Sequence, residues 1–181
     1  MRLFVALDLP QGLRDALCVV QDGLGVGREV PEENLHLTLA FLDDQPSQAA
    51  EALHDMLSAI RAPQVRLTIR GVDGFGGKRY GLVAALVEKV PELISLQEKV
   101  AQAARMAGID LPRRRFKPHV SLVRFPRHLS DSAQSRIGAW LALHGDLSLD
   151  GGDATQFSLY RSTLREEGPV YEPLANYPLL A

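Results

Sequence analysis

The chain has 181 residues, of which 46% are hydrophobic and 23% are charged, and its formal net charge at pH 7 is −2. This length suits one domain or two closely packed lobes, and the charge balance excludes a strongly basic nucleic-acid coat while allowing a local basic patch. Cys18 is the single cysteine, which excludes a disulfide framework and a cysteine-based zinc site. Asp8 and Pro10 interrupt the apolar N-terminal run, so we expect neither a signal peptide nor a membrane span, and a cytoplasmic protein.

The first half of the chain predicts the order strand, helix, strand, helix, strand. Alternating apolar residues predict strands at 2–9, 35–42 and 65–69, and helical spacing predicts helices at 10–24 and 48–60. The glycine-rich stretch 71–78 (GVDGFGGK) could be read as a phosphate-binding loop. It lacks the order G-x-x-x-x-G-K-[ST] and leads into a strand, so we favour a hairpin-like connection.

From Tyr80 the order of elements starts again. Residues 82–86 (LVAAL) resemble residues 3–7 (LFVAL), and a proline follows each. The patterns predict helices at 92–107 and 129–143 and strands at 118–125, 156–164 and 169–174. We interpret residues 1–181 as a single domain of two intimately packed lobes, formed by internal duplication of a β-α-β-α-β unit with halves of about 1–77 and 78–181. The expected fold class is α+β, with mostly antiparallel sheets flanking a central groove and helices on the outside.

Two short motifs occupy equivalent strands of the two halves: His36-Leu37-Thr38-Leu39 and His119-Val120-Ser121-Leu122. Residues two apart in a strand point to the same face, so each histidine should share a face with the hydroxyl residue that follows it. In the first strand, Leu37, Leu39 and Phe41 should then bury the opposite face. The alternative is that both motifs are half-buried strand histidines whose hydroxyl neighbours simply face water.

If the two copies pack about a pseudo-two-fold axis, His36 and His119 converge on a groove between the lobes. Two opposed imidazoles suit in-line displacement at phosphorus, because one takes a proton from the attacking water and the other gives one to the leaving oxygen. The hydroxyls of Thr38 and Ser121 can bind the non-bridging phosphate oxygens. No carboxylate or cysteine stands at a ligand-like spacing beside the histidines, so we expect no metal and no cofactor.

A basic run leads into the second histidine strand. No acidic residue lies between Asp110 and Asp131, whereas six basic residues do: Arg113, Arg114, Arg115, Lys117, Arg124 and Arg127. The run is either a solvated loop or a source of positive potential for a phosphate-bearing substrate. Phe116 within it could stack on a base or be buried.

The paired H-x-[ST]-x motifs resemble the signature of the two-histidine (2H) phosphoesterases. Four further stretches are similar to the RNA 2',3'-cyclic phosphodiesterase branch of that superfamily, also called 2'-5' RNA ligases: RLFVALDLP, ENLHLTLAFL, RRFKPHVSLVRF and SLYRSTLREEGPVYEPL. The resemblance implies a bilobal fold and metal-independent hydrolysis of RNA 2',3'-cyclic phosphate ends to 2'-phosphates, with reversible 2'-5' RNA ligation as a further reaction.

The resemblance also implies roles for individual residues. His36 is the implied proton donor, His119 the proton acceptor, and Thr38 and Ser121 bind the substrate phosphate. Arg124 stands where such proteins often carry an arginine near the phosphate, although simple alternation along the strand would place it on the opposite face from His119.

The expected partner is an RNA or oligonucleotide with a 2',3'-cyclic phosphate end, bound by a monomer without a membrane. Two alternatives stay open: a non-catalytic RNA-end or nucleotide-binding module, and a phosphodiesterase acting on another cyclic phosphate or on a 2'-5' oligonucleotide.

Overall fold

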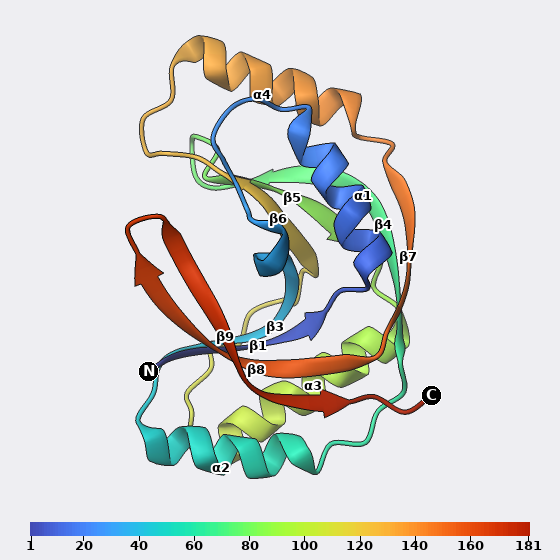
Figure 1. The fold of residues 1–181 in the computed structure, drawn as a ribbon, viewed down its shortest axis with the longest axis vertical. Helices are drawn as coiled ribbons and strands as arrows, with labels where there is room; N and C mark the ends of the chain where they lie inside the picture. The colour runs from blue at the N-terminus through green and yellow to red at the C-terminus, as the bar shows by residue number, and fades with distance from the viewer.

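The computed structural model describes residues 1–181, and it confirms the α+β class (Figure 1). The four α-helices lie close to the predicted ranges: α1 (Gln11–Asp22), α2 (Ser47–Ser58), α3 (Pro91–Met106) and α4 (Asp131–Leu143). A short 3-10 turn, η1 (Glu32–Asn34), precedes the first histidine motif. No helix combines the length and the apolar character needed to cross a bilayer.

Nine strands form two sheets in which every neighbouring pair is antiparallel. The strands are β1 (Arg2–Asp8), β2 (Arg28–Glu29), β3 (His36–Asp44), β4 (Val65–Phe75), β5 (Leu82–Val87), β6 (His119–Arg124), β7 (Ser148–Ala154), β8 (Gln156–Arg165) and β9 (Gly168–Pro178). Sheet A has the order β3-β1-β8-β9, and sheet B has the order β2-β6-β5-β4-β7. Each sheet therefore takes strands from both halves of the sequence.

The helices also exchange between the sheets. α1 follows β1 of sheet A but contacts β6 and β7 of sheet B, whereas α3 connects β5 and β6 of sheet B but contacts β3 of sheet A. In Figure 1, α1 and α4 accordingly lie at one end of the molecule, and α2 and α3 lie together at the other. One cluster of 39 buried residues contains side chains of both sheets, so the two lobes share a single hydrophobic core.

The glycine-rich stretch forms a hairpin connection, as predicted, but β4 extends further into it than the pattern indicates. Asp73 and Gly74 still pair with β5, and only residues 76–81 form the turn. Gly74 is required at its position because the ring of Tyr80 covers it, and an added Cβ would lie 2.5 Å from the Tyr80 Cδ1 atom. The glycine thus serves close packing within a strand.

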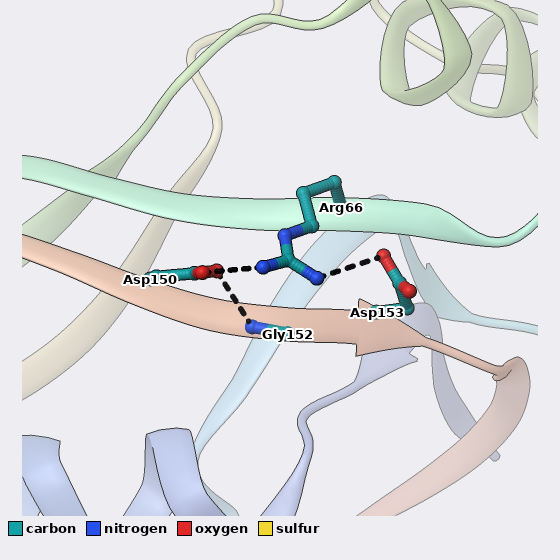
Figure 2. Close-up of polar contacts among 4 residues, drawn as sticks. All are labelled: Arg66, Asp150, Gly152 and Asp153. Carbon is teal, nitrogen blue, oxygen red and sulfur yellow. Dashed lines mark hydrogen bonds and ion pairs between the residues drawn. The ribbon is translucent and has the colours of Figure 1, made fainter.

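β7 is a strand that the sequence does not predict, because SLDGGDA lacks alternating apolar residues. Gly151 is buried against α1, where a Cβ would lie 2.7 Å from a methyl carbon of Leu13. Figure 2 shows Arg66 of β4 reaching Asp150 and Asp153 of β7, while the Gly152 amide donates to Asp150 at 3.2 Å. The Gly152 amide and the Arg66 guanidinium together lower the pKa of Asp150. These ion pairs are exposed, so pairing with β4 is what makes this segment a strand.

Candidate active site

The two histidine motifs meet where the two sheets adjoin. His36 opens β3 at the edge of sheet A, His119 opens β6 of sheet B, and these two strands contact each other. The register places Thr38 on the face of His36 and Ser121 on the face of His119. Arg124 and His119 lie close enough to His36 to lower its pKa. The structure therefore brings the two histidine motifs close together, and we call the surface that the faces of His36 and His119 present to each other the groove.

The same backbone device orients both imidazole rings. His36 Nδ1 lies 2.7 Å from the carbonyl oxygen of Asn34, and His119 Nδ1 lies 2.7 Å from that of Lys117. A carbonyl oxygen only accepts, so each Nδ1 carries a proton and each neutral ring keeps Nε2 as its basic nitrogen. The carbonyl belongs in both cases to the residue two positions before the histidine. Nε2 of each ring is thus the atom available for proton transfer.

The two histidines differ in what surrounds Nε2. Nε2 of His36 lies 2.9 Å from Thr38 Oγ1, and the hydroxyl donates to the neutral ring. Nε2 of His119 has no hydrogen-bond partner in the protein, and neither does the half-buried Ser121 hydroxyl. On the His119 side, the protein therefore leaves one ring nitrogen and one hydroxyl free to bind a substrate.

Burial lowers the pKa of His36 to about 4. The residue keeps some exposed surface, but its ring is packed between Phe4, at 4.9 Å, and the edge of Tyr171, at 5.3 Å. The charges of Arg124 and His119 lower the pKa further, while the Asn34 carbonyl and Asp8 raise it. In the empty groove His36 is consequently neutral at pH 7.

Aromatic rings also fix His119. Phe75, at the end of β4, stacks on the imidazole with 4.7 Å between ring centroids and an interplanar angle of 25°. The Lys117 ammonium lies over the Phe75 ring, 4.5 Å from its centroid. Phe4 packs against the His36 ring and Phe75 against the His119 ring. The alternation within each strand does not predict these two contacts.

A β-bulge corrects the expectation from simple alternation for Arg124. Ser121 pairs with Ala84 and Val123 with Val83, so Leu122 is an extra residue in β6. The bulge reverses the alternation after Ser121, and it places Arg124 on the same face as His119. The arginine side chain is exposed, and its charge acts on His36. The position implied by the resemblance is therefore compatible with the structure.

The equivalent bulge in β3 makes the prediction for Phe41 wrong. Thr38 pairs with Ala6 and Ala40 with Val5, so Leu39 is the extra residue, three positions after the histidine as in β6. Phe41 then lies on the face of His36, where it is 46% exposed and the Arg2 guanidinium lies 5.3 Å from its ring centroid. Phe41 is the counterpart of Arg124 in the other lobe.

Asp8 and Tyr171 are site residues that the sequence did not single out. Asp8 lies directly across from His36 in the β1–β3 pair, and it accepts hydrogen bonds from Gln156, Ser158 and Tyr160. Tyr171 of β9 contacts the His36 ring, and it helps to line a cavity of about 140 Å³ together with Asn34 and Arg124. A carboxylate inside the apolar run RLFVALDL is the one signal that could have identified Asp8.

The basic run divides in the structure. Arg113, Arg114 and Arg115 are exposed in the loop before β6, whereas Phe116 packs against the hydrophobic core. Burial is thus the interpretation of Phe116 that the structure supports. No group of three or more His, Cys, Asp or Glu side chains is arranged to hold a metal ion.

Solved structures and characterised relatives resemble this chain over nearly its full length. The RNA 2',3'-cyclic phosphodiesterase of Thermus thermophilus is 31% identical, in an alignment covering 99% of this chain and 90% of the relative. The enzyme of the same name from Escherichia coli is 29% identical over 98% of this chain and 96% of the relative. The crystal structure of E. coli LigT complexed with 3'-AMP superposes with a TM-score of 0.78 at 26% identity, covering 99% of this chain and 98% of LigT.

The family model described as the 2'-5' RNA ligase superfamily matches residues 24–149, which include both histidine motifs. With this match, the near-complete relatives and the paired-histidine groove, the chain belongs to the 2'-5' RNA ligase superfamily of 2H phosphoesterases.

Proposed function

We propose that this protein is an RNA 2',3'-cyclic phosphodiesterase, which hydrolyses the cyclic phosphate at an RNA end to a 2'-phosphate. The observation that carries the proposal is the pair of imidazoles in one groove, each with Nδ1 held by a backbone carbonyl and Nε2 left for proton transfer. Full-length relatives with this activity support the substrate class. The proposed partner is an RNA or oligonucleotide end, bound by a monomer in the cytoplasm.

In the proposed reaction, His119 Nε2 takes a proton from a water molecule whose oxygen attacks phosphorus. The bond from phosphorus to the 3' oxygen breaks, and His36 Nε2–H gives its proton to that oxygen. The hydroxyls of Thr38 and Ser121 and the Arg124 guanidinium stabilise the charge on the non-bridging oxygens. Afterwards His119 is charged and His36 neutral, and exchange with solvent restores both. A 5'-hydroxyl in place of water would form a 2'-5' linkage by the same transfers.

The low pKa of His36 adds a requirement to this assignment. The ring is neutral in the empty groove, so the proton donor must be charged as the substrate binds. A phosphate anion beside the ring opposes the effect of the Arg124 charge, which lowers the pKa, and Thr38 can turn its hydroxyl from Nε2 to a phosphate oxygen. Substrate binding and protonation of His36 are therefore coupled.

The activity is tested with adenosine 2',3'-cyclic phosphate, with the product identified by phosphorus NMR. His36→Ala and His119→Ala should each lower kcat about 10²- to 10⁴-fold, while His128→Ala, at an exposed histidine outside the groove, should leave it unchanged. Equal activity of the two groove variants and the wild type would refute the proposal.

A 3'-thio cyclic substrate separates the two roles, because a thiolate leaves with little need of a proton. His36→Ala should then be largely rescued, and His119→Ala should not. Rescue of His119→Ala instead, or a 3'-phosphate product from the ordinary substrate, would reverse the roles of the two histidines.

A further inference from the structure

Two arginines lie side by side at the end of the groove next to His36. Arg28 of β2 pairs directly with Arg124 of β6, so their side chains share one face of sheet B. Because of the bulge at Leu122, this is the face of His119. Like charges directly opposite each other in a sheet destabilise the pairing, so strand pairing does not account for two arginines at these positions.

Neither guanidinium is neutralised by the protein. Neither forms a hydrogen bond or lies within 4.0 Å of a carboxylate, although Arg66, Arg70 and Arg161 all have such partners. The two arginines line the same cavity of about 140 Å³ as Tyr171, Asn34 and Glu167. Glu29 and Glu167 also line this cavity, but neither lies within 4.0 Å of either guanidinium, so both arginines keep hydrogen-bond donors free for an anion.

The turn of the β8–β9 hairpin lies beside Arg28. Gly168 has a φ of +121°, and a Cβ added there would lie 3.3 Å from Arg28 Nη1. The hairpin of sheet A therefore reaches the edge strand of sheet B, and backbone lies against the guanidinium. Arg28 is exposed, and it lies between this turn and Arg124 at the cavity.

We propose that Arg28 binds the phosphate on the 5' oxygen of the terminal nucleoside, so that the groove recognises two phosphates of one nucleotide. This inference rests on the proposed function, in which Thr38, Ser121 and Arg124 serve the cyclic phosphate. Arg28 lies one strand further from the histidines, a displacement of about 4.8 Å that one nucleotide can span. The preferred ligand is a nucleotide or RNA strand with a 5'-phosphate or phosphodiester, rather than a nucleoside cyclic phosphate.

The test compares kcat/KM for three substrates: adenosine 2',3'-cyclic phosphate, its 5'-phosphorylated form, and the dinucleotide ApA ending in a cyclic phosphate. The wild type should prefer each phosphorylated substrate by about tenfold, the effect of one charge-assisted hydrogen bond. Arg28→Gln should bring both ratios close to one, and Arg28→Lys should keep part of the preference. Arg105→Gln, at an exposed arginine in the last turn of α3, is the matched control and should leave the ratios unchanged.

The outcomes separate this inference from the proposed function. If Arg28→Gln loses the preference for both phosphorylated substrates, the ligand of Arg28 is the phosphate of an RNA strand. If it loses the preference for the 5'-monophosphate alone, the ligand is a mononucleotide. Unchanged ratios in Arg28→Gln, or an equal fall on all three substrates, would overturn the inference. If no substrate turned over, the proposed function would fail, and calorimetry would still decide the inference. It would compare the affinity for adenosine 2'-phosphate with that for adenosine 2',5'-bisphosphate, and Arg28→Gln should remove the difference.

Discussion

Binding of a phosphate anion should raise the pKa of His36 by several units. With a pKa of about 4, protonating the ring at pH 7 costs about 4 kcal/mol. One negative charge about 4 Å from the ring contributes about 4 kcal/mol at an effective dielectric constant of about 20. The two magnitudes match, so a bound phosphate should bring the pKa of His36 to about 7. His36, the proposed proton donor, would then be charged when substrate is present and neutral when it is not.

Imidazole NMR of labelled protein measures this directly, in the free state and with saturating adenosine 2'-phosphate. The free protein should show His36 as the Nδ1–H tautomer with a midpoint near pH 4, and the bound protein a midpoint near neutrality. Arg124→Gln should raise the midpoint of the free protein, because it removes a charge that lowers the pKa. A free midpoint at or above 6.5 would refute the argument from burial. A bound midpoint that stays below about 5 would exclude His36 as the proton donor.

Three further predictions concern stability and strand binding. Since the pKa of His36 is below its ordinary value of 6.5, the free energy of unfolding should fall by about 3 kcal/mol as the pH falls from 6.5 to 4. Urea titrations of His36→Gln should lack this pH-dependent loss of stability. Gln21→Leu should lower the free energy of unfolding by about 2 kcal/mol and should also lower kcat/KM, because the buried Gln21 amide donates to the carbonyl of the bulged Leu122. Gln102→Leu, at an exposed residue, is the control and should change neither quantity, so equal effects of the two substitutions would contradict the role of the bulge. Replacing the arginines at 113–115 with glutamine should reduce, by about 2, the slope of log affinity for longer single-stranded RNA against log salt concentration, and it should leave mononucleotide binding unchanged. Equal losses of affinity for RNA and for the mononucleotide would mean that the basic run shapes the site itself.

The sequence predicted the helices and the longer strands well, because their periodicity reflects one buried face. β2 and β7 were not predicted, for different reasons. β2 has only two residues and therefore no pattern, and β7 contains glycines, of which Gly151 is required by contact with α1. In both cases the evidence for the strand is a partner distant in the sequence. No local pattern contains that information.

The site was predictable as far as the paired motifs and no further. His36 and His119 follow from the repeat, but the faces of Phe41 and Arg124 depend on one extra residue in each strand. A bulge changes the parity of every later residue and leaves no mark in the apolar pattern, because Leu39 and Leu122 are buried in either case. The bulge occurs three positions after both histidines, as an internal duplication would predict.

The position of β1 between β3 and β8 determines when the catalytic groove can form during synthesis. Asp8 of β1 accepts a hydrogen bond from Ser158, which lies 150 positions later in the chain. Until β8 has left the ribosome, β1 and β3 have an unpaired edge, and His36 lacks Tyr171, which forms part of its enclosure. Pairing at such long range makes folding slow and leaves partly made chains prone to aggregation. The groove is thus assembled last, and a chain that ends before β8 has both motifs but no finished site.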